Sequence, residues 1–157
     1  MNSAVKSDGV EAERAHKRAC DLLANATMSE LQQAWAAHEP KPDVTPLRGP
    51  ETGLVMVRGR IGGGGDPFNL GEITVSRASV RLDCGSVGHG QTLGTSREKS
   101  RLAAIFDALW QRPDLQEEIE RKLLLPVAER LAAEDRKKAE ETAATRVDFF
   151  TMVRGED

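Results

Sequence analysis

The strongest hydrophobic periodicity in the chain lies between residues 95 and 111. Its apolar positions are Leu102, Ile105, Phe106, Leu109 and Trp110. Residues at this spacing share one face of a helix, so the pattern predicts an amphipathic helix whose apolar face packs in the core. Thr95 and Glu98 have capping-box spacing, which predicts that the helix begins there.

An alanine-rich stretch near the N-terminus also predicts helix. Residues 10–38 are expected to form two short helices that break near residues 25–27. The pairs with capping-box spacing in front of them are Asp8 with Glu11 and Ser29 with Gln32. We therefore expect an N-terminal helical part.

Helical character continues after residue 113. Asp114 and Glu117 have capping-box spacing, and Pro126 is expected to kink or restart the helix because proline has no N–H to donate. From residue 127 the sequence is rich in Ala, Glu, Lys and Arg but weakly apolar. Such a helix is expected to pack on one side only or against another chain.

Short β-branched or apolar runs separated by glycine-bearing turns occupy the middle of the chain. They are Leu54–Val57, Ile73–Val75, Val80–Leu82 and Val87–Leu93. Connections this short exclude parallel crossovers, so the runs predict an antiparallel meander. Residues 39–50 carry four prolines and are expected to form a stiff connector, neither helix nor central strand.

Together these elements predict an α+β fold in one domain of 157 residues. The expected order is N-terminal helices (1–38), the proline-rich connector (39–50), a central antiparallel sheet (51–94), C-terminal helices (95–144), and a terminal strand or extended arm (145–157).

The composition excludes several classes of function. A net charge of −3 gives no attraction for nucleic acid or an anionic membrane, and only 4% of the residues are aromatic. No apolar run is long enough to span a membrane and no secretory leader is expected, so we expect a cytoplasmic protein. Cys20 and Cys84 lack the spacing of a zinc site or a disulfide framework, so no metal or cofactor is expected in this chain.

A run of four glycines is the most unusual local feature. The segment contains Arg58, Arg60, Gly62, Gly63, Gly64 and Gly65. Glycines let several N–H groups face one anion, and arginines two apart on a strand point to the same side, which suggests a phosphate or phosphonate site. The segment lacks a P-loop ending and no helix follows it, so a flexible hairpin connection is the alternative.

Catalytic residue types are sparse. His89 lies between two glycines on a predicted strand and suits acid–base chemistry, but a lone histidine is more often structural or exposed. His16 and His38 are expected on helix surfaces without a functional role. No GxSxG or Cys–His nucleophile motif occurs, so the sequence predicts no catalytic residue.

The last residues return to an apolar pattern after the polar helix. They include Phe149, Phe150, Met152 and Val153. Adjacent phenylalanines point to opposite faces of an extended strand, so both faces need cover. We expect this tail to rejoin the sheet or to insert into a partner subunit.

Several segments together carry a resemblance to one family, and the closing string is the most specific of them because no generic fold demands it. They are residues 51–55, 60–65, 68–72, 74–82 and 85–88, and the closing string RVDFFTMVRG at residues 146–155. These segments resemble the G subunit (PhnG) family of the bacterial carbon–phosphorus lyase core complex, over most of residues 51–157. The chain departs from the expected pattern in having Gly62–Gly65 in place of Gly-Gly-Thr-Gly and Cys84 in place of an acidic residue.

The resemblance implies a supporting role in phosphonate catabolism. Family members assemble with H, I and J subunits, and the complex transfers the ribose-triphosphate moiety of ATP to an alkylphosphonate and releases adenine. The resemblance places the nucleosidase chemistry in the I subunit, and this chain lacks the cysteines of a radical iron–sulfur subunit. Two alternatives stay open, an independent enzyme using His89 and a free-standing binding module for a phosphorylated metabolite.

Overall fold

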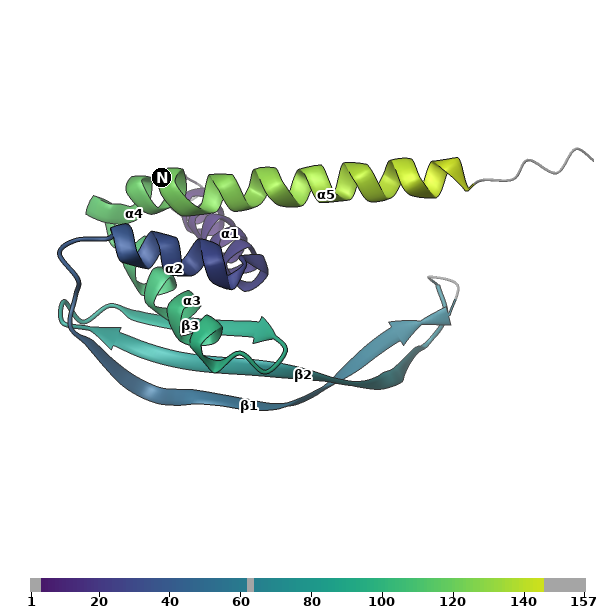
Figure 1. Ribbon diagram of the computed structural model, residues 1–157, viewed down its shortest axis with the longest axis horizontal. Coiled ribbons are helices and arrows are strands. Elements are labelled where there is room, and N and C mark those ends of the chain that lie inside the picture. The colour runs from purple at the N-terminus through teal and green to yellow at the C-terminus, as the bar shows by residue number, and fades with distance from the viewer. Residues whose placement is uncertain (1–3, 62–63, 146–157) are drawn as a thin grey trace, which may run out of the picture.

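Three antiparallel strands form a sheet, and helices pack on one of its faces (Figure 1). The structure is a computed structural model that describes residues 4–61 and 64–145. The strands are β1 (Val44–Arg60), β2 (Pro67–Leu82) and β3 (Val87–Leu93), in the spatial order β1-β2-β3. The helices are α1 (Ala4–Asn25), α2 (Met28–Ala37), α3 (Arg97–Trp110), α4 (Pro113–Ile119) and α5 (Leu125–Ala144), with a π-helical turn η2 (Glu120–Leu124) before α5. The predicted α+β class is confirmed.

The strands are longer than the sequence pattern predicted. Ile73–Val75 and Val80–Leu82, predicted as separate strands, both belong to β2. β1 begins at Val44, so the prediction of a connector over residues 39–50 is wrong from that point. β1 is an edge strand, and its pairing with β2 shifts register beside Pro46. Edge strands and bulges tolerate proline, because its missing N–H can face solvent.

The predicted helix starts are displaced. α1 begins at Ala4, ahead of the predicted start at Asp8. The predicted caps Ser29 with Gln32, Thr95 with Glu98, and Asp114 with Glu117 are wrong by one or two residues. The observed capping positions are Thr27 with Glu30 for α2, Ser96 for α3, and Arg112, without a side-chain hydrogen bond, for α4. Neighbouring Ser, Thr and Asp residues offer similar caps, and packing decides which one stays outside the helix.

The contact between α3 and β3 brings two backbones together at Gly88 and Gly90. A Cβ atom at Gly90 would lie 2.6 Å from the backbone nitrogen of Ala104, and one at Gly88 would lie 2.5 Å from that of Ala108. The facing side of α3 carries alanines and serine, so no large side chain separates the helix from the strand. Both positions therefore require glycine.

The helical segment from α4 to α5 passes through the π-helical turn η2. The backbone N–H of Leu125 donates to the carbonyl of Glu120 across that widened turn. Pro126 is the second residue of α5, a position near a helix start where its missing N–H costs little. The expectation of a kink or restart at Pro126 agrees with the start of α5 at Leu125, directly after the π-helical turn.

Arg130 fastens the base of α5 to α2. Its guanidinium donates to both carboxylate oxygens of Glu30, at 2.8 and 3.1 Å, and to the backbone carbonyl of Asn25 at 3.0 Å. This hydrogen-bonded ion pair lowers the pKa of Glu30. Beyond Leu131 every described residue of α5 is exposed, and the helix extends past the core to the right of Figure 1.

The outer half of the β1–β2 pair forms a two-stranded ribbon. β3 pairs with β2 only from Val75 to Arg81, so the β1–β2 pairing from Leu54–Thr74 to Arg60–Pro67 has no third strand beside it. In Figure 1 the ribbon extends past the helices that pack on the sheet and bends up toward the side on which α5 extends. Two-stranded ribbons have little stability of their own in water, so this part of the sheet depends on its surroundings.

The glycine contact predicts a sharp difference between two Gly→Ala variants. Gly90→Ala places a methyl group against α3 and is expected to lower the free energy of unfolding by about 3 kcal/mol. Gly53→Ala in β1 is the matched control, because a Cβ there meets nothing within 4 Å. Urea unfolding followed by circular dichroism measures both variants. Equal stability of the two would contradict the close packing of α3 on β3.

Candidate functional site

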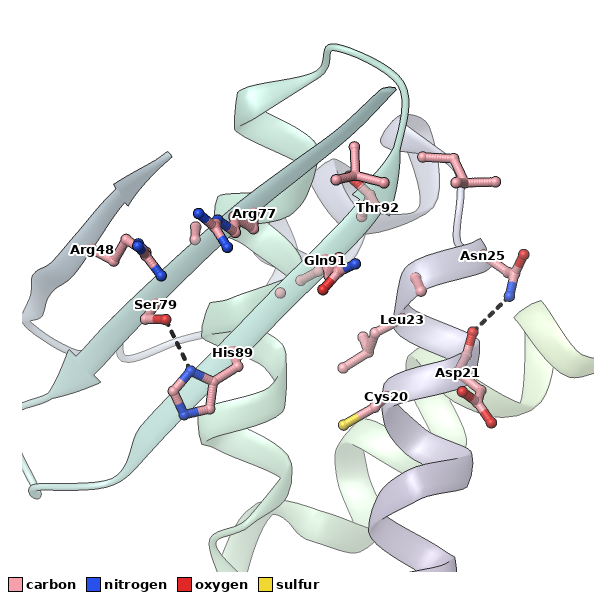
Figure 2. Close-up of a pocket in the computed structure, with 16 residues that line it drawn as sticks. Cys20, Asp21, Leu23, Asn25, Arg48, Arg77, Ser79, His89, Gln91 and Thr92 are labelled. Carbon is pink, nitrogen blue, oxygen red and sulfur yellow. Dashed lines mark hydrogen bonds between the residues drawn. The ribbon is translucent and has the colours of Figure 1, made fainter. Parts of the chain in front are cut away.

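A cleft with a volume of about 620 Å³ lies between α1 and the free edge of β3 (Figure 2). Its α1 wall includes Cys20 and Leu23, and its sheet wall includes residues from both faces of β3. Thr92, on the buried face of β3, lines the cleft with a hydroxyl that has no hydrogen-bond partner among the described residues. The cleft therefore offers a mixed apolar and polar lining.

Two arginines line the cleft on the face of the sheet that the helices do not cover. Arg48 on β1 and Arg77 on β2 both contact the Oε1 atom of Glu51, at 2.9 and 2.6 Å. The three side chains are about half exposed. Since one carboxylate serves two guanidinium groups, the cluster keeps one net positive charge toward solvent, and this weakens its pull on an anion relative to two free arginines.

His89 forms a hydrogen-bonded pair with Ser79. The Nδ1 atom of the ring lies 2.9 Å from the Ser79 hydroxyl, and the two residues are direct partners across the β2–β3 pair (Figure 2). A serine nucleophile needs a base that a third group orients. Among the described residues, no carboxylate contacts the His89 ring, so the pair lacks that third group.

Asp107 on α3 is the buried polar centre beside this cleft. Its side chain is 1% exposed, and its Oδ2 atom accepts the backbone N–H of His89 at 2.8 Å. Gln111, one turn further along α3, donates to the carbonyl of Val87 at 2.9 Å and to Asp107 Oδ2 at 3.3 Å. These side chains satisfy backbone groups on the outer edge of β3, which protects that edge from pairing with another strand.

His16 and Cys20 of α1 reach the same carboxylate. The Nε2 atom of His16 lies 2.6 Å from Asp107 Oδ1, and the Cys20 thiol donates to that oxygen at 3.6 Å. His16 lies partly exposed on α1, and its contact with the buried Asp107 carboxylate is not one that the sequence predicted. Sequence spacing alone did not reveal this cluster, since Asp107 lies 87 residues after Cys20.

His38 is also placed differently from the prediction. It is buried and ends α2, where its backbone N–H donates to the carbonyl of Trp35 at 3.3 Å. Its ring stacks on Trp35 with 6.3 Å between centroids. His38 is therefore buried against Trp35 at the end of α2.

The predicted arginine–glycine segment lies at the far end of the ribbon (Figure 1). Its described residues Arg58, Arg60, Gly64 and Gly65 do not line the cleft. Arg58 and Arg60 face Asn69 and Pro67 across the ribbon, and their spacing puts both on one side. Arg60 donates from Nη1 to the carbonyl of Gly65 at 3.2 Å, which helps to close the hairpin. Gly62 and Gly63 lie outside the described residues, as do the predicted interface residues Phe149, Phe150, Met152 and Val153.

The ribbon exposes apolar side chains on both of its faces. Val55 and Ile73 are direct cross-strand partners, and Leu54 and Met56 alternate with them onto the opposite face. All four are exposed, Leu54 to 63%. Apolar side chains gathered on a protruding element are typical of protein–protein interfaces. Within the described residues, no helix is long and apolar enough to cross a membrane. An α+β fold with such a surface is typical of a chain that associates with other chains.

Comparisons with known proteins agree with this class. The family model described as "Phosphonate metabolism protein PhnG" matches residues 14–155, and the chain belongs to that family. One relative is 65% identical over 159 aligned positions, which cover 100% of this chain and 99% of the relative. That relative is the alpha-D-ribose 1-methylphosphonate 5-triphosphate synthase subunit PhnG of Rhizobium meliloti (strain 1021). The resemblance found in the sequence is confirmed.

The two cysteines are expected to differ strongly in reactivity. Burial, aided by the Asp107 carboxylate, raises the pKa of Cys20 to about 11, so only about one part in a thousand is thiolate at pH 8. The Ser86 hydroxyl lowers the pKa of the exposed Cys84. Iodoacetamide at pH 8 should therefore alkylate Cys84 at least about tenfold faster than Cys20.

Peptide mass spectrometry over a time course separates the two sites. Cys20 should gain reactivity steadily as the pH rises toward 11, because its thiolate fraction increases up to its pKa. A urea-unfolded sample is the control, in which the two cysteines should react at similar rates. Equal rates in the folded protein would contradict the burial of Cys20 beside Asp107.

Proposed function

We propose that this chain is a subunit of an alpha-D-ribose 1-methylphosphonate 5-triphosphate synthase and works only within that assembly. The full-length relative is named as such a subunit. The exposed apolar ribbon is the structural observation that carries the proposal. Its two faces, with Leu54 on one and Val55 with Ile73 on the other, need cover that the described part of this chain does not supply.

In the proposed reaction, the assembly joins an alkylphosphonate to the ribose triphosphate of ATP. A phosphonate oxygen forms a bond to the ribose anomeric carbon, and the bond from that carbon to adenine breaks. Adenine leaves with the electron pair and takes up a proton. We place this chemistry in the cytoplasm, where ATP is available, and in another subunit, because His89 and Ser79 lack an orienting carboxylate.

The proposed partners are the H, I and J subunits of the carbon–phosphorus lyase core complex. The match of residues 14–155 to the PhnG family model supports this assignment. We propose that the ribbon is one contact and that the tail containing Phe149, Phe150, Met152 and Val153 is another. The exposed second half of α5 leads toward that tail and extends beyond the core on the same side as the ribbon in Figure 1.

A free-standing binding module for a phosphorylated metabolite is the weaker alternative. It would use the cleft beside Arg48 and Arg77, whose charges are partly neutralised by Glu51. The alternative gives no reason for the apolar ribbon.

A chain that is monomeric and soluble alone, and that turns over ATP and methylphosphonate without partners, would contradict the subunit proposal and favour an independent enzyme.

Charges placed on the ribbon are expected to prevent assembly. Val55→Lys combined with Ile73→Lys puts two positive charges on one apolar face, where a partner would have to bury them. Co-expression with the H, I and J subunits and affinity purification through a partner measures retention. We expect retention of the double variant to fall by more than about tenfold.

Leu125→Lys is the matched control, since Leu125 is comparably exposed at the start of α5 and outside the ribbon. Its retention should match that of the unaltered chain. Circular dichroism of each variant checks that the fold is intact. If a folded ribbon variant is retained normally, the ribbon is not part of the interface.

The arginine pair at the ribbon tip is proposed to touch the anionic substrate or a neighbouring subunit. Replacing Arg58 and Arg60 with Ala should slow growth on methylphosphonate as the phosphorus source and leave co-purification intact, if the guanidinium groups bind substrate. Arg101→Ala on α3, which removes an arginine paired locally with Glu98, is the control. Wild-type growth of the double variant would mean that Arg58 and Arg60 bind no substrate and are ordinary charged residues of the surface.

A further inference from the structure

Three donor groups of different chemistry converge beside the cleft. His16 and Cys20 lie four residues apart on α1 and so share one helix face, while Asp107 comes from α3. The donor atoms of the three side chains all lie within 4.8 Å of one another. Nitrogen, sulfur and oxygen donors that converge in this way are the ligand types that zinc uses in proteins.

The distances between the donors are close to those around a bound ion. His16 Nε2 lies 2.6 Å and Cys20 Sγ 3.6 Å from Asp107 Oδ1. Metal bonds of about 2.0–2.3 Å in a tetrahedron place donor atoms roughly 3.3–3.8 Å apart. Shifts of about 1 Å or less, within the range of small side-chain rotations, would therefore admit the ion.

Neighbouring groups hold two of the donors in place. Asp107 presents Oδ1 because its other oxygen accepts the His89 N–H at 2.8 Å and is also near the Gln111 amide. The His16 ring stacks on Trp110, with 5.6 Å between centroids and 9° between planes. Such outer contacts orient metal ligands and contribute to affinity.

We propose that His16, Cys20 and Asp107 bind a Zn²⁺ ion that links α1 to α3. Imidazole, thiolate and carboxylate together suit zinc better than magnesium or calcium, which prefer oxygen alone. Binding replaces the thiol proton of Cys20, which passes to solvent. Thiolate and carboxylate then balance the two charges of the ion, so the half-buried site carries no net charge.

The fourth position of the ion is left to water. The His16 side chain is 40% exposed, which gives the ion and a water ligand access from solvent. This site differs from the expectation of no metal in the chain. That expectation considered only cysteine spacing, and the third ligand joins the pair through tertiary packing. The proposal does not depend on the function of the assembly.

Cobalt is the probe, because Co²⁺ bound by a thiolate absorbs in the near ultraviolet and in the visible. The full-length chain, purified without a histidine tag and treated with chelator, is titrated with Co²⁺ and then with Zn²⁺. We expect thiolate–cobalt bands that Zn²⁺ displaces. Cys20→Ser should abolish the near-ultraviolet band, and His16→Gln should weaken Co²⁺ binding by more than about tenfold.

Cys84→Ser is the matched control, because Cys84 is the other free cysteine and lies outside the cluster. It should bind Co²⁺ as the unaltered chain does. Zn²⁺ should raise the melting temperature of the unaltered chain and of Cys84→Ser, but not that of Cys20→Ser. Cys20→Ala serves in place of Cys20→Ser if circular dichroism shows that the serine variant is unfolded.

Three outcomes would overturn the proposal. They are a folded, reduced chain without thiolate–cobalt bands, bands that survive in the Cys20 variants, and bands that disappear with Cys84→Ser. Any of them would leave His16, Cys20 and Asp107 as a hydrogen-bonded cluster only. If the chain is soluble only with its partners, the same titration compares the assembly containing the unaltered chain with the assembly containing Cys20→Ser.

Discussion

The close approach of α3 to β3 at Gly88 and Gly90 is the constraint on which the rest of the structure depends. Because no side chain separates the two backbones, the face of α3 that carries Asp107 lies directly against the edge strand. That carboxylate then satisfies the backbone of His89, which a helix held further away could not reach. The short distance between α3 and β3 thus allows Asp107 to bind the backbone on the outer edge of the sheet, which keeps that edge from pairing with another strand.

The same contact places the polar cluster around Asp107 and the cleft on one side of the molecule. α1 packs beside β3, so His16 and Cys20 meet Asp107 there and the cleft opens beside them. Burial beside a carboxylate keeps Cys20 as a neutral thiol in the absence of an ion, whereas a cation would reverse that preference. One polar cluster therefore both fastens α1 and carries the proposed zinc site.

Two elements extend beyond this well-packed part. The β1–β2 ribbon has apolar side chains on both faces and no third strand, and α5 leaves the core after Arg130 fastens its base to Glu30. A chain on its own gains little from either extension, because each exposes surface without burying a core. Both are explained by a subunit whose outer parts are covered in an assembly, in agreement with its membership of the PhnG family.

The sequence by itself determined the helix α3, the antiparallel strands, the α+β class and the family, because periodicity, turns and a distinctive string of residues are local properties. It misjudged the length of β1 and the helix caps, since pairing with β2 and packing choose among locally similar options. Only the tertiary structure brought Asp107 to Cys20 and separated Arg58 and Arg60 from the cleft. Such contacts depend on how segments that are distant in the sequence pack together, and local sequence patterns do not indicate how far apart those segments lie in the fold.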